Sequence, residues 1–318
     1  MQADQAQKRL PGSLLPGVLA ISVLAASYLL PIIGTFFIPL LPAPLAYARL
    51  RYGTANFLAS SIPCILLVSI TGGFPVVTAV VLALCISGYA IGGALRSGVP
   101  YDRAVFKAGL VPALVVGPLL GFYYLLAGAD PWTLLGQTMD QGLKESVELY
   151  KRIGMSQSDI VTVLPSLKLF SRMLVEFLPA VSVCFMALTA FFNYFLVRSH
   201  AARAGILAGE AEPMNRWTAP DLAVWGVIVP GFLLIPNVPL LRQAAGNLFA
   251  VFGLVFLFQG VAVVSFYFEK VKLTPFLKGL GAFIIAMQPY LMLAMWCVGL
   301  FDTWADFRKL RAKQTPAK

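Results

Sequence analysis

A few polar side chains interrupt long apolar segments, and these residues are best suited to bind a small molecule. An ionised group at the centre of a bilayer costs about 2.5–3.5 kcal/mol, so such residues are rare and often mark a functional site. Glu176 is expected one turn into an apolar segment over residues 173–197 and is therefore a candidate for ligand binding. Its alternative role is an ion pair with Arg172, four residues earlier on the same helix face. The candidate ligand-binding residues are Glu176, Asn193, Tyr123, Tyr124 and Gln259.

Each of the other candidates also has a plain structural interpretation. The amides of Asn193 and Gln259 can form hydrogen bonds between membrane helices. Tyr123 and Tyr124 lie near one end of their apolar segment, where aromatic belts are expected in any membrane protein.

A second group of polar residues lies in the carboxyl-terminal sequence GLFDTWADFRK. Trp304 and Arg308 are four residues apart, a spacing that on a helix allows a cation–π contact. Asp302 and Asp306 repel each other at the same spacing, so each needs another partner, such as Lys309 for Asp306. We expect this motif to anchor the chain at the membrane interface, with Arg308 reaching anionic headgroups; the alternative is a docking element for a partner protein.

Catalytic and metal-binding patterns are not evident in the sequence. The four cysteines stand singly in apolar segments, and one histidine, His200, cannot build a multi-histidine site. No paired carboxylates or nucleophile–base arrangement stands out, so we expect neither an enzyme nor a bound metal or cofactor. The net charge of +10 is dispersed in short clusters beside apolar segments, which argues against a nucleic-acid partner and for basic loops on the cytoplasmic side.

The elements that position these residues are membrane helices. The chain has 318 residues, 59% hydrophobic and 12% charged, whereas soluble domains carry about 25% charged residues. We expect an all-α polytopic bundle embedded in the lipid bilayer, with eight or nine transmembrane segments. They are predicted over residues 14–30, 36–48, 55–71, 76–95, 108–127, 173–197, 221–235, 245–268 and 279–301.

The first two segments form an uncharged stretch over residues 11–48. This stretch is too long for one crossing, and prolines crowd its second half, so we expect a hairpin. Lys8 and Arg9 precede it and Arg49 and Arg51 follow it, which places both ends, and the amino terminus, in the cytoplasm.

The one long polar stretch, residues 130–172, is expected on the external side of the membrane because its acidic and basic residues balance. Asp130 and Pro131 predict the start of an amphipathic helix that ends near Gly154. Ser156 and Asp159 predict the cap of a second helix, broken at Pro165. The first helix either covers the mouth of the bundle as a lid or lies on the membrane interface.

Small residues four apart predict close helix packing at two places, Gly88 with Gly92 and Gly117 with Gly121. A partner-docking face is the alternative at each.

The side of the carboxyl terminus depends on residues 221–235. This segment is short and interrupted by prolines, and if it does not cross, eight crossings place the basic tail, residues 308–318, in the cytoplasm. The five cations of that tail outweigh Lys270, Lys272 and Lys278 at the other end of the last segment.

Three stretches together resemble a known family: PLAYARLRYG, GMSQSDIVTVLPS and the end from LFQGVAVVSF to GLFDTWADFRK. The chain resembles the YybS-like family of uncharacterised bacterial inner-membrane proteins. Through the return helix at residues 36–53, the amino-terminal part is similar to the substrate-binding S components of energy-coupling-factor transporters. The resemblance implies a six-helix core over residues 1–200, with the external insertion at about 130–172, and added membrane helices and a basic tail over residues 201–318.

The chain departs from S components in two respects. It continues beyond six helices, and the alanine-rich coupling motif of their first helix is poorly matched. The sequence shows no nucleotide-binding loop, so any coupling and ATPase subunits would be separate proteins. Two functions therefore stay open: a small-molecule-binding or transport-related protein, and a non-transporting scaffold or regulator of an envelope process.

Overall fold

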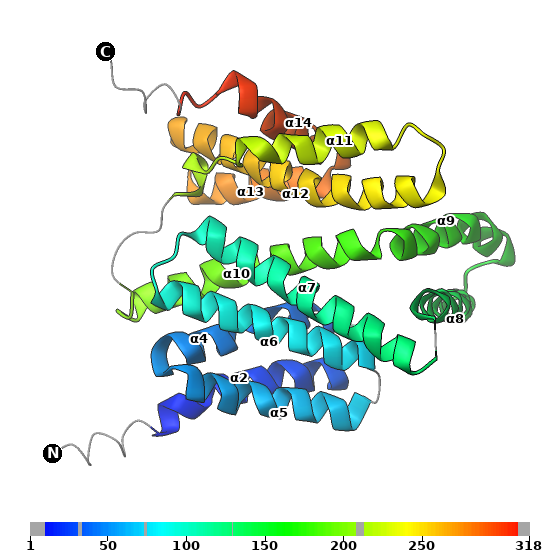
Figure 1. Ribbon diagram of the computed structural model, residues 1–318, viewed down its shortest axis with the longest axis horizontal. Helices are drawn as coiled ribbons and strands as arrows, with labels where there is room; N and C mark the ends of the chain where they lie inside the picture. Colours follow the sequence, from blue (N-terminus) through cyan, green and yellow to red (C-terminus); the bar gives the residue numbers. More distant parts are fainter. Residues whose placement is uncertain (1–9, 31–33, 73–74, 129, 208–212, 311–318) are drawn as a thin grey trace. The chain divides into compact units, whose positions relative to one another are not determined.

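The computed structural model describes residues 10–30, 34–72, 75–128, 130–207 and 213–310, which contain twelve α-helices and three 3₁₀ helices. Five helices are long and apolar enough to cross a membrane, or six if one bent pair counts as a span. The chain is thus a polytopic membrane helix bundle. It divides into two compact units, residues 1–209 and 210–318, drawn from blue to green and from yellow to red in Figure 1.

The amino-terminal unit contains eight α-helices and one 3₁₀ helix in its described part. In order they are α2 (Leu10–Leu29), η1 (Thr35–Leu40), α4 (Pro42–Tyr52), α5 (Thr54–Gly72), α6 (Pro75–Arg96), α7 (Tyr101–Leu126), α8 (Pro131–Arg152), α9 (Gln157–Glu176) and α10 (Leu178–Arg203). Of these, α5, α6, α7 and α10 are long enough to span a membrane.

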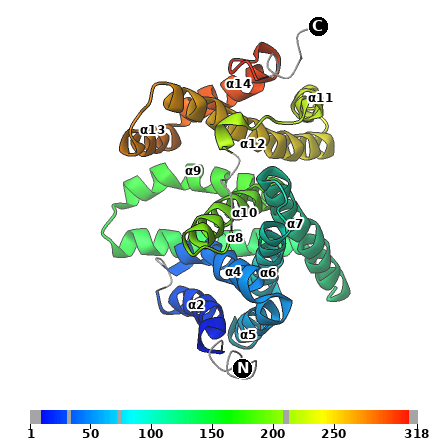
Figure 2. The ribbon, with the colours of Figure 1, turned by 90° about the vertical axis from the view of Figure 1, so that its left-hand side faces the viewer.

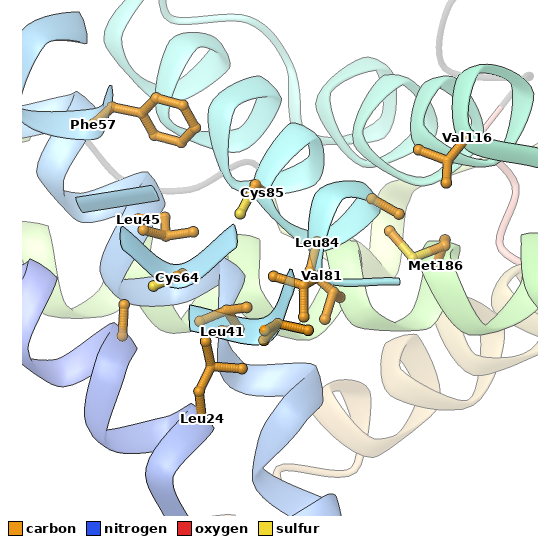
Figure 3. Close-up of a cluster of buried hydrophobic side chains, with 13 residues drawn as sticks. Leu24, Leu41, Leu45, Phe57, Cys64, Val81, Leu84, Cys85, Val116 and Met186 are labelled. Atoms are coloured by element: carbon orange, nitrogen blue, oxygen red, sulfur yellow. The ribbon is translucent and has the colours of Figure 1, made fainter. Parts of the chain in front are cut away.

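The short helix α4 lies at the centre of this unit, in contact with α2, α5, α6 and α10. Its side chains join a cluster of buried apolar residues from these helices and α7, in which Leu24, Leu45, Cys64 and Leu84 are at most 2% exposed (Figure 3). The packing is close because Gly88 and Gly92 of α6 face α4, as their spacing predicted. A Cβ atom at Gly92 would lie 2.5 Å from the carbonyl oxygen of Ala46.

Helices α8 and α9 form a hairpin that extends from the rest of the amino-terminal unit (Figure 2). The caps are those expected: the Thr133 amide donates to Asp130, and the Asp159 amide donates to the hydroxyl of Ser156. The expected break at Pro165 is wrong, because α9 continues through it to Glu176. Pro165 has no N–H group, so the carbonyl of Val161 loses its helical hydrogen bond. Val161 is 59% exposed, so this carbonyl is not buried and the helix can continue through the proline.

The carboxyl-terminal unit begins in its described part with η2 (Met214–Arg216), η3 (Asp221–Val224) and α11 (Trp225–Leu233). The apolar helix over Asp221–Leu233 is shorter than a full span. Helix α12 (Pro239–Lys270) is the long helix of this unit and packs on α11 and α14. Its contact with α14 is close, since a Cβ atom at Gly299 would lie 2.0 Å from the Phe256 oxygen.

The last apolar segment was expected as one helix over residues 279–301, and this is wrong. It is two helices, α13 (Pro275–Met287) and α14 (Pro289–Ala305), bent by 103°. Between them Gln288 is extended, with φ −110° and ψ 108°. A residue before proline avoids the helical conformation, and Pro289 supplies that restriction.

Candidate functional site

The structure places the expected ligand-binding residues on four helices. Tyr123 and Tyr124 lie near the end of α7, with ring centroids 5.5 Å apart and the Tyr123 side chain 52% exposed. Asn193 lies in α10, and Gln259 lies in α12 of the carboxyl-terminal unit. Among these candidates the structure brings only the two adjacent tyrosines into a described contact.

Glu176 is the last residue of α9, not a residue one turn into the next membrane helix. The chain breaks at Phe177, and Pro179 lies in the first turn of α10, where its ring cannot continue the preceding helix. Glu176 forms the ion pair expected with Arg172, at 3.9 Å between Nε and Oε1, and its side chain is 52% exposed. It therefore lies at an exposed junction between two helices.

Asn193 contacts the junction of η1 and α4, where the chain changes from a 3₁₀ helix to an α-helix at Leu41. Pro42 and Pro44 lack the N–H groups that would bond the carbonyls of Ile38 and Leu40, and the Leu41 amide instead makes a tight bond to Ile38, at 3.0 Å. The Asn193 amide nitrogen donates to the carbonyl of Pro39 at 2.7 Å. A side chain of α10 thus supports the junction of η1 and α4.

The oxygen of the same amide has no hydrogen-bond partner among the described residues. The Asn193 nitrogen also donates to the Thr189 carbonyl, at 2.7 Å, so two acceptors determine which way the amide points. The residue is 1% exposed, and its Oδ1 is buried without a hydrogen-bond partner among the described residues. A buried acceptor without a donor is costly, and an N–H or O–H group of a bound molecule would satisfy it.

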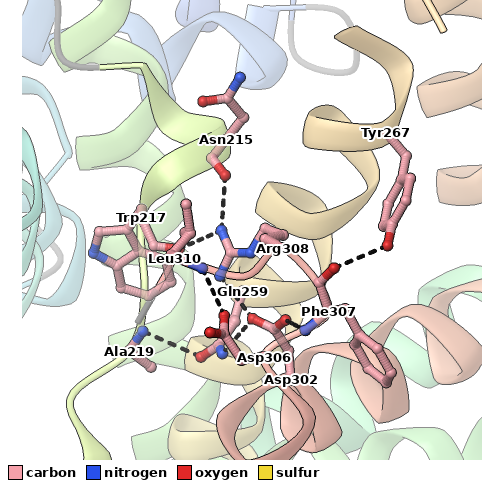
Figure 4. A network of polar contacts seen from close by, with 10 residues as sticks. All are labelled: Asn215, Trp217, Ala219, Gln259, Tyr267, Asp302, Asp306, Phe307, Arg308 and Leu310. Carbon is pink, nitrogen blue, oxygen red and sulfur yellow. Dashed lines mark hydrogen bonds and ion pairs between the residues drawn. The ribbon is translucent and has the colours of Figure 1, made fainter. Parts of the chain in front are cut away.

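The carboxyl-terminal motif forms a different kind of site, a buried ion pair. Arg308 Nη2 lies 2.7 Å from Asp302 Oδ2, and both side chains are at most 2% exposed (Figure 4). Gln259 connects this pair to the backbone: its Nε2 donates to Asp302 Oδ2 at 3.1 Å, and its Oε1 accepts from the Ala219 amide at 3.1 Å. Both ends of the Gln259 amide are therefore engaged.

Arg308 also binds the backbone of the segment that contains η2 and precedes η3. Its Nη1 donates to the carbonyls of Asn215 and Trp217, each at 2.8 Å. The second oxygen of Asp302 accepts from the Phe307 amide, at 3.0 Å. The motif therefore ties the end of α14 to the beginning of the carboxyl-terminal unit, which is a structural role.

Two expectations for this motif are wrong. Arg308 is 3% exposed, so it does not reach lipid headgroups, and its partner is Asp302 rather than the ring of Trp304. Both expectations assumed a helix that continues to Arg308. The helix ends at Ala305, and Asp306 adopts a left-handed conformation, with φ 42°, which turns the chain back so that Arg308 meets Asp302. Trp304 remains 59% exposed, and Asp306 accepts from the Leu310 amide.

Comparison with known families identifies the chain over most of its length. Residues 17–303 match the family described as predicted membrane protein (DUF2232), and the chain belongs to this family. Comparisons with curated proteins and with solved structures found no match. Within the described residues, no group of three or more histidine, cysteine, aspartate or glutamate side chains could hold a metal ion.

Proposed function

We propose that this DUF2232 membrane protein is a non-enzymatic, transport-related protein that binds a small molecule at the junction of η1 and α4. The observation that carries the proposal is the buried Oδ1 of Asn193, which has no donor within the described residues. The junction changes from a 3₁₀ helix to an α-helix, and its prolines remove helical hydrogen bonds; transporters place substrates where membrane helices are interrupted in this way.

The chemistry of the junction limits the ligand. Asn193 is a neutral amide, so it offers a hydrogen-bond acceptor but no charge. A small solute with an N–H or O–H donor suits it. Tyr123, Tyr124 and Glu176, at exposed helix ends, are proposed to contact the solute on its way in. We do not assign Gln259 to the ligand, because its oxygen and nitrogen both have protein partners.

The resemblance to energy-coupling-factor S components and the YybS-like family supports a location in the bacterial cytoplasmic membrane and separate coupling and ATPase subunits. Purification in mild detergent tests this, since such subunits would co-purify. We propose an even number of crossings with both termini cytoplasmic. The Asp221–Leu233 helix is shorter than a full span, which supports only the part of this proposal in which that segment does not cross. A cysteine placed in the carboxyl-terminal tail tests the side of that tail. If a membrane-impermeant maleimide labels this cysteine in intact spheroplasts, the tail is outside and the proposal is wrong.

A non-transporting scaffold is the second candidate, and the α8–α9 hairpin favours it. Five large apolar side chains of this hairpin are more than half exposed: Leu149, Ile153, Val161, Leu169 and Phe170. A partner protein could cover them, and then no small ligand would be required.

Thermal unfolding of the detergent-purified protein against a panel of small polar solutes tests the leading proposal. We expect a solute that raises the melting temperature of the wild type and of Asn247→Ala, a matched control in α12, but not of Asn193→Leu. Glu176→Gln should reduce the shift. Each shift is compared with the same variant without solute. An unchanged shift in Asn193→Leu would remove the junction from the site, and no active solute together with a co-purifying protein would favour the scaffold.

A further inference from the structure

One end of the amino-terminal unit carries arginines from two helices with almost no acidic residues to balance them. Arg49 and Arg51 lie in the last turn of α4, and Arg96 is the last residue of α6. Asp102 is the only acidic residue between positions 5 and 129 of the sequence. No described carboxylate forms an ion pair with Arg49, Arg51 or Arg96.

Arg49 is held in a defined orientation on the surface of α6. Its guanidinium carbon lies 3.2 Å from the centroid of the Tyr89 ring, and Nη1 donates to the Tyr89 carbonyl. Two glycines of α6 allow this close approach. A Cβ atom at Gly92 would lie 2.8 Å from Arg49 Cβ, and one at Gly93 would lie 2.8 Å from the guanidinium carbon, so larger residues would displace the Arg49 side chain. The cation is therefore preorganised instead of extending freely into solvent.

Arg96 lies on the same end of the unit and is exposed. Its Nη1 is 3.4 Å from the place where a Cβ atom of Gly53 would be, just after α4. Arg49 and Arg96 are close enough to repel each other electrostatically. Two neighbouring guanidinium groups with no carboxylate between them are stabilised by an anion that contacts both.

Arg51 extends this basic surface toward α10. Its Nη1 donates to the hydroxyl of Tyr47 at 2.9 Å, and the Tyr47 ring meets the edge of His200 with 5.2 Å between centroids. The surface thus combines three arginines with tyrosine side chains, groups that favour the boundary between lipid and water.

We propose that Arg49 and Arg96 bind the phosphate of an anionic phospholipid. The position on the helices selects this ligand: Arg96 ends the membrane-spanning helix over Val76–Arg96, at the level where lipid phosphates lie. Guanidinium groups bind phosphate oxygens through paired N–H donors, and basic surfaces between membrane helices bind anionic headgroups. The proposal is independent of the solute site at Asn193.

The test is thermal unfolding of the detergent-purified protein during titration with phosphatidylglycerol, phosphatidylcholine or inorganic phosphate. Arg96→Gln is the main variant because Arg96 is exposed and should not be needed for folding. Arg103→Gln, an exposed arginine in the first turn of α7, is the control with the same change of charge. We expect phosphatidylglycerol to stabilise the wild type and Arg103→Gln equally, and Arg96→Gln to bind it about fivefold more weakly.

A second variant addresses geometry. Arg49→Lys keeps the charge but loses the planar fork on Tyr89, and it should also weaken binding. Four results would overturn the proposal: unchanged lipid affinity in Arg96→Gln, an equal loss in Arg103→Gln, equal stabilisation by phosphatidylcholine, or equal stabilisation by inorganic phosphate. The second would indicate a diffuse surface charge, and the last a site for a soluble anion.

Discussion

The two units differ in the charge of the buried polar side chains that connect their helices. In the amino-terminal unit, the neutral amide of Asn193 contacts the junction of η1 and α4 and keeps one acceptor without a partner among the described residues. In the carboxyl-terminal unit, the charges of Asp302 and Arg308 neutralise each other, and Gln259 completes the contacts of the carboxylate. The paired charge contacts three backbone groups, which suits structural support. Buried atoms without a partner among the described residues occur in both units, since Arg308 Nε, Asn215 Oδ1 and Thr303 Oγ1 also lack one, so the difference lies in the ion pair and not in satisfied hydrogen bonding.

The close approach of helices is, by contrast, common to both units. In the amino-terminal unit Gly88 and Gly92 of α6 allow contact with α4, and in the carboxyl-terminal unit Gly260 and Gly299 allow contact between α12 and α14. The units therefore differ in their polar chemistry and not in how their helices pack.

The largest effect should come from breaking the buried ion pair. Arg308→Met leaves Asp302 buried and charged, and loss of one partner of such a pair costs about 3–5 kcal/mol. We expect the carboxyl-terminal unit to unfold first when this variant is titrated with denaturing detergent and followed by proteolysis. The double variant Asp302→Leu with Arg308→Met should recover part of the stability. If the single variant is as stable as the wild type, the pair does not support the fold.

The ion pair could not be predicted from the sequence, because its two residues are six apart. On a continuous helix that spacing places side chains on different faces. The pair requires the helix to end at Ala305 and Asp306 to adopt a positive φ, a conformation that most residues other than glycine avoid. The motif itself was recognisable by its charges within an apolar context, but its partners, the carbonyls of Asn215 and Trp217, are distant in sequence.

A smaller effect should separate two glycine pairs that look alike in the sequence. Gly92→Ala brings a methyl group against the Ala46 carbonyl and should cost about 1–3 kcal/mol. Gly117→Ala in α7 is the control, because a Cβ atom there meets no described atom within 4 Å. We expect the melting temperature to fall for the first variant only. An equal fall for Gly117→Ala would mean that this glycine packs against another molecule.

The class of fold was evident from composition, whereas the helix ends required local detail. The charged fraction and apolar segments identified a membrane bundle, and local side-chain chemistry identified the caps at Asp130 and Ser156. The packing of Gly117 and the bend at Gln288 could not be predicted from spacing and apolar length. Spacing does not say which helix faces a glycine, and the apolar length of residues 279–301 does not reveal the bend before Pro289. Asn193 was predicted either to bind a ligand or to form a hydrogen bond between helices, but its partner Pro39 could not be predicted because it lies 154 residues away.

The smallest effect is expected at the exposed ion pair of Glu176 and Arg172. The pair spans 3.9 Å, and the two side chains are 52% and 79% exposed, so water and salt weaken it. Glu176→Gln should lower the free energy of unfolding by less than about 1 kcal/mol, and by less still at high salt, as measured by unfolding at two ionic strengths. Arg172→Gln should have the same effect, because each removes the same pair. A much larger loss in Glu176→Gln alone would show that this carboxylate has a further structural partner. If the two variants match in stability, a loss of solute-dependent stabilisation seen only in Glu176→Gln is attributable to ligand contact.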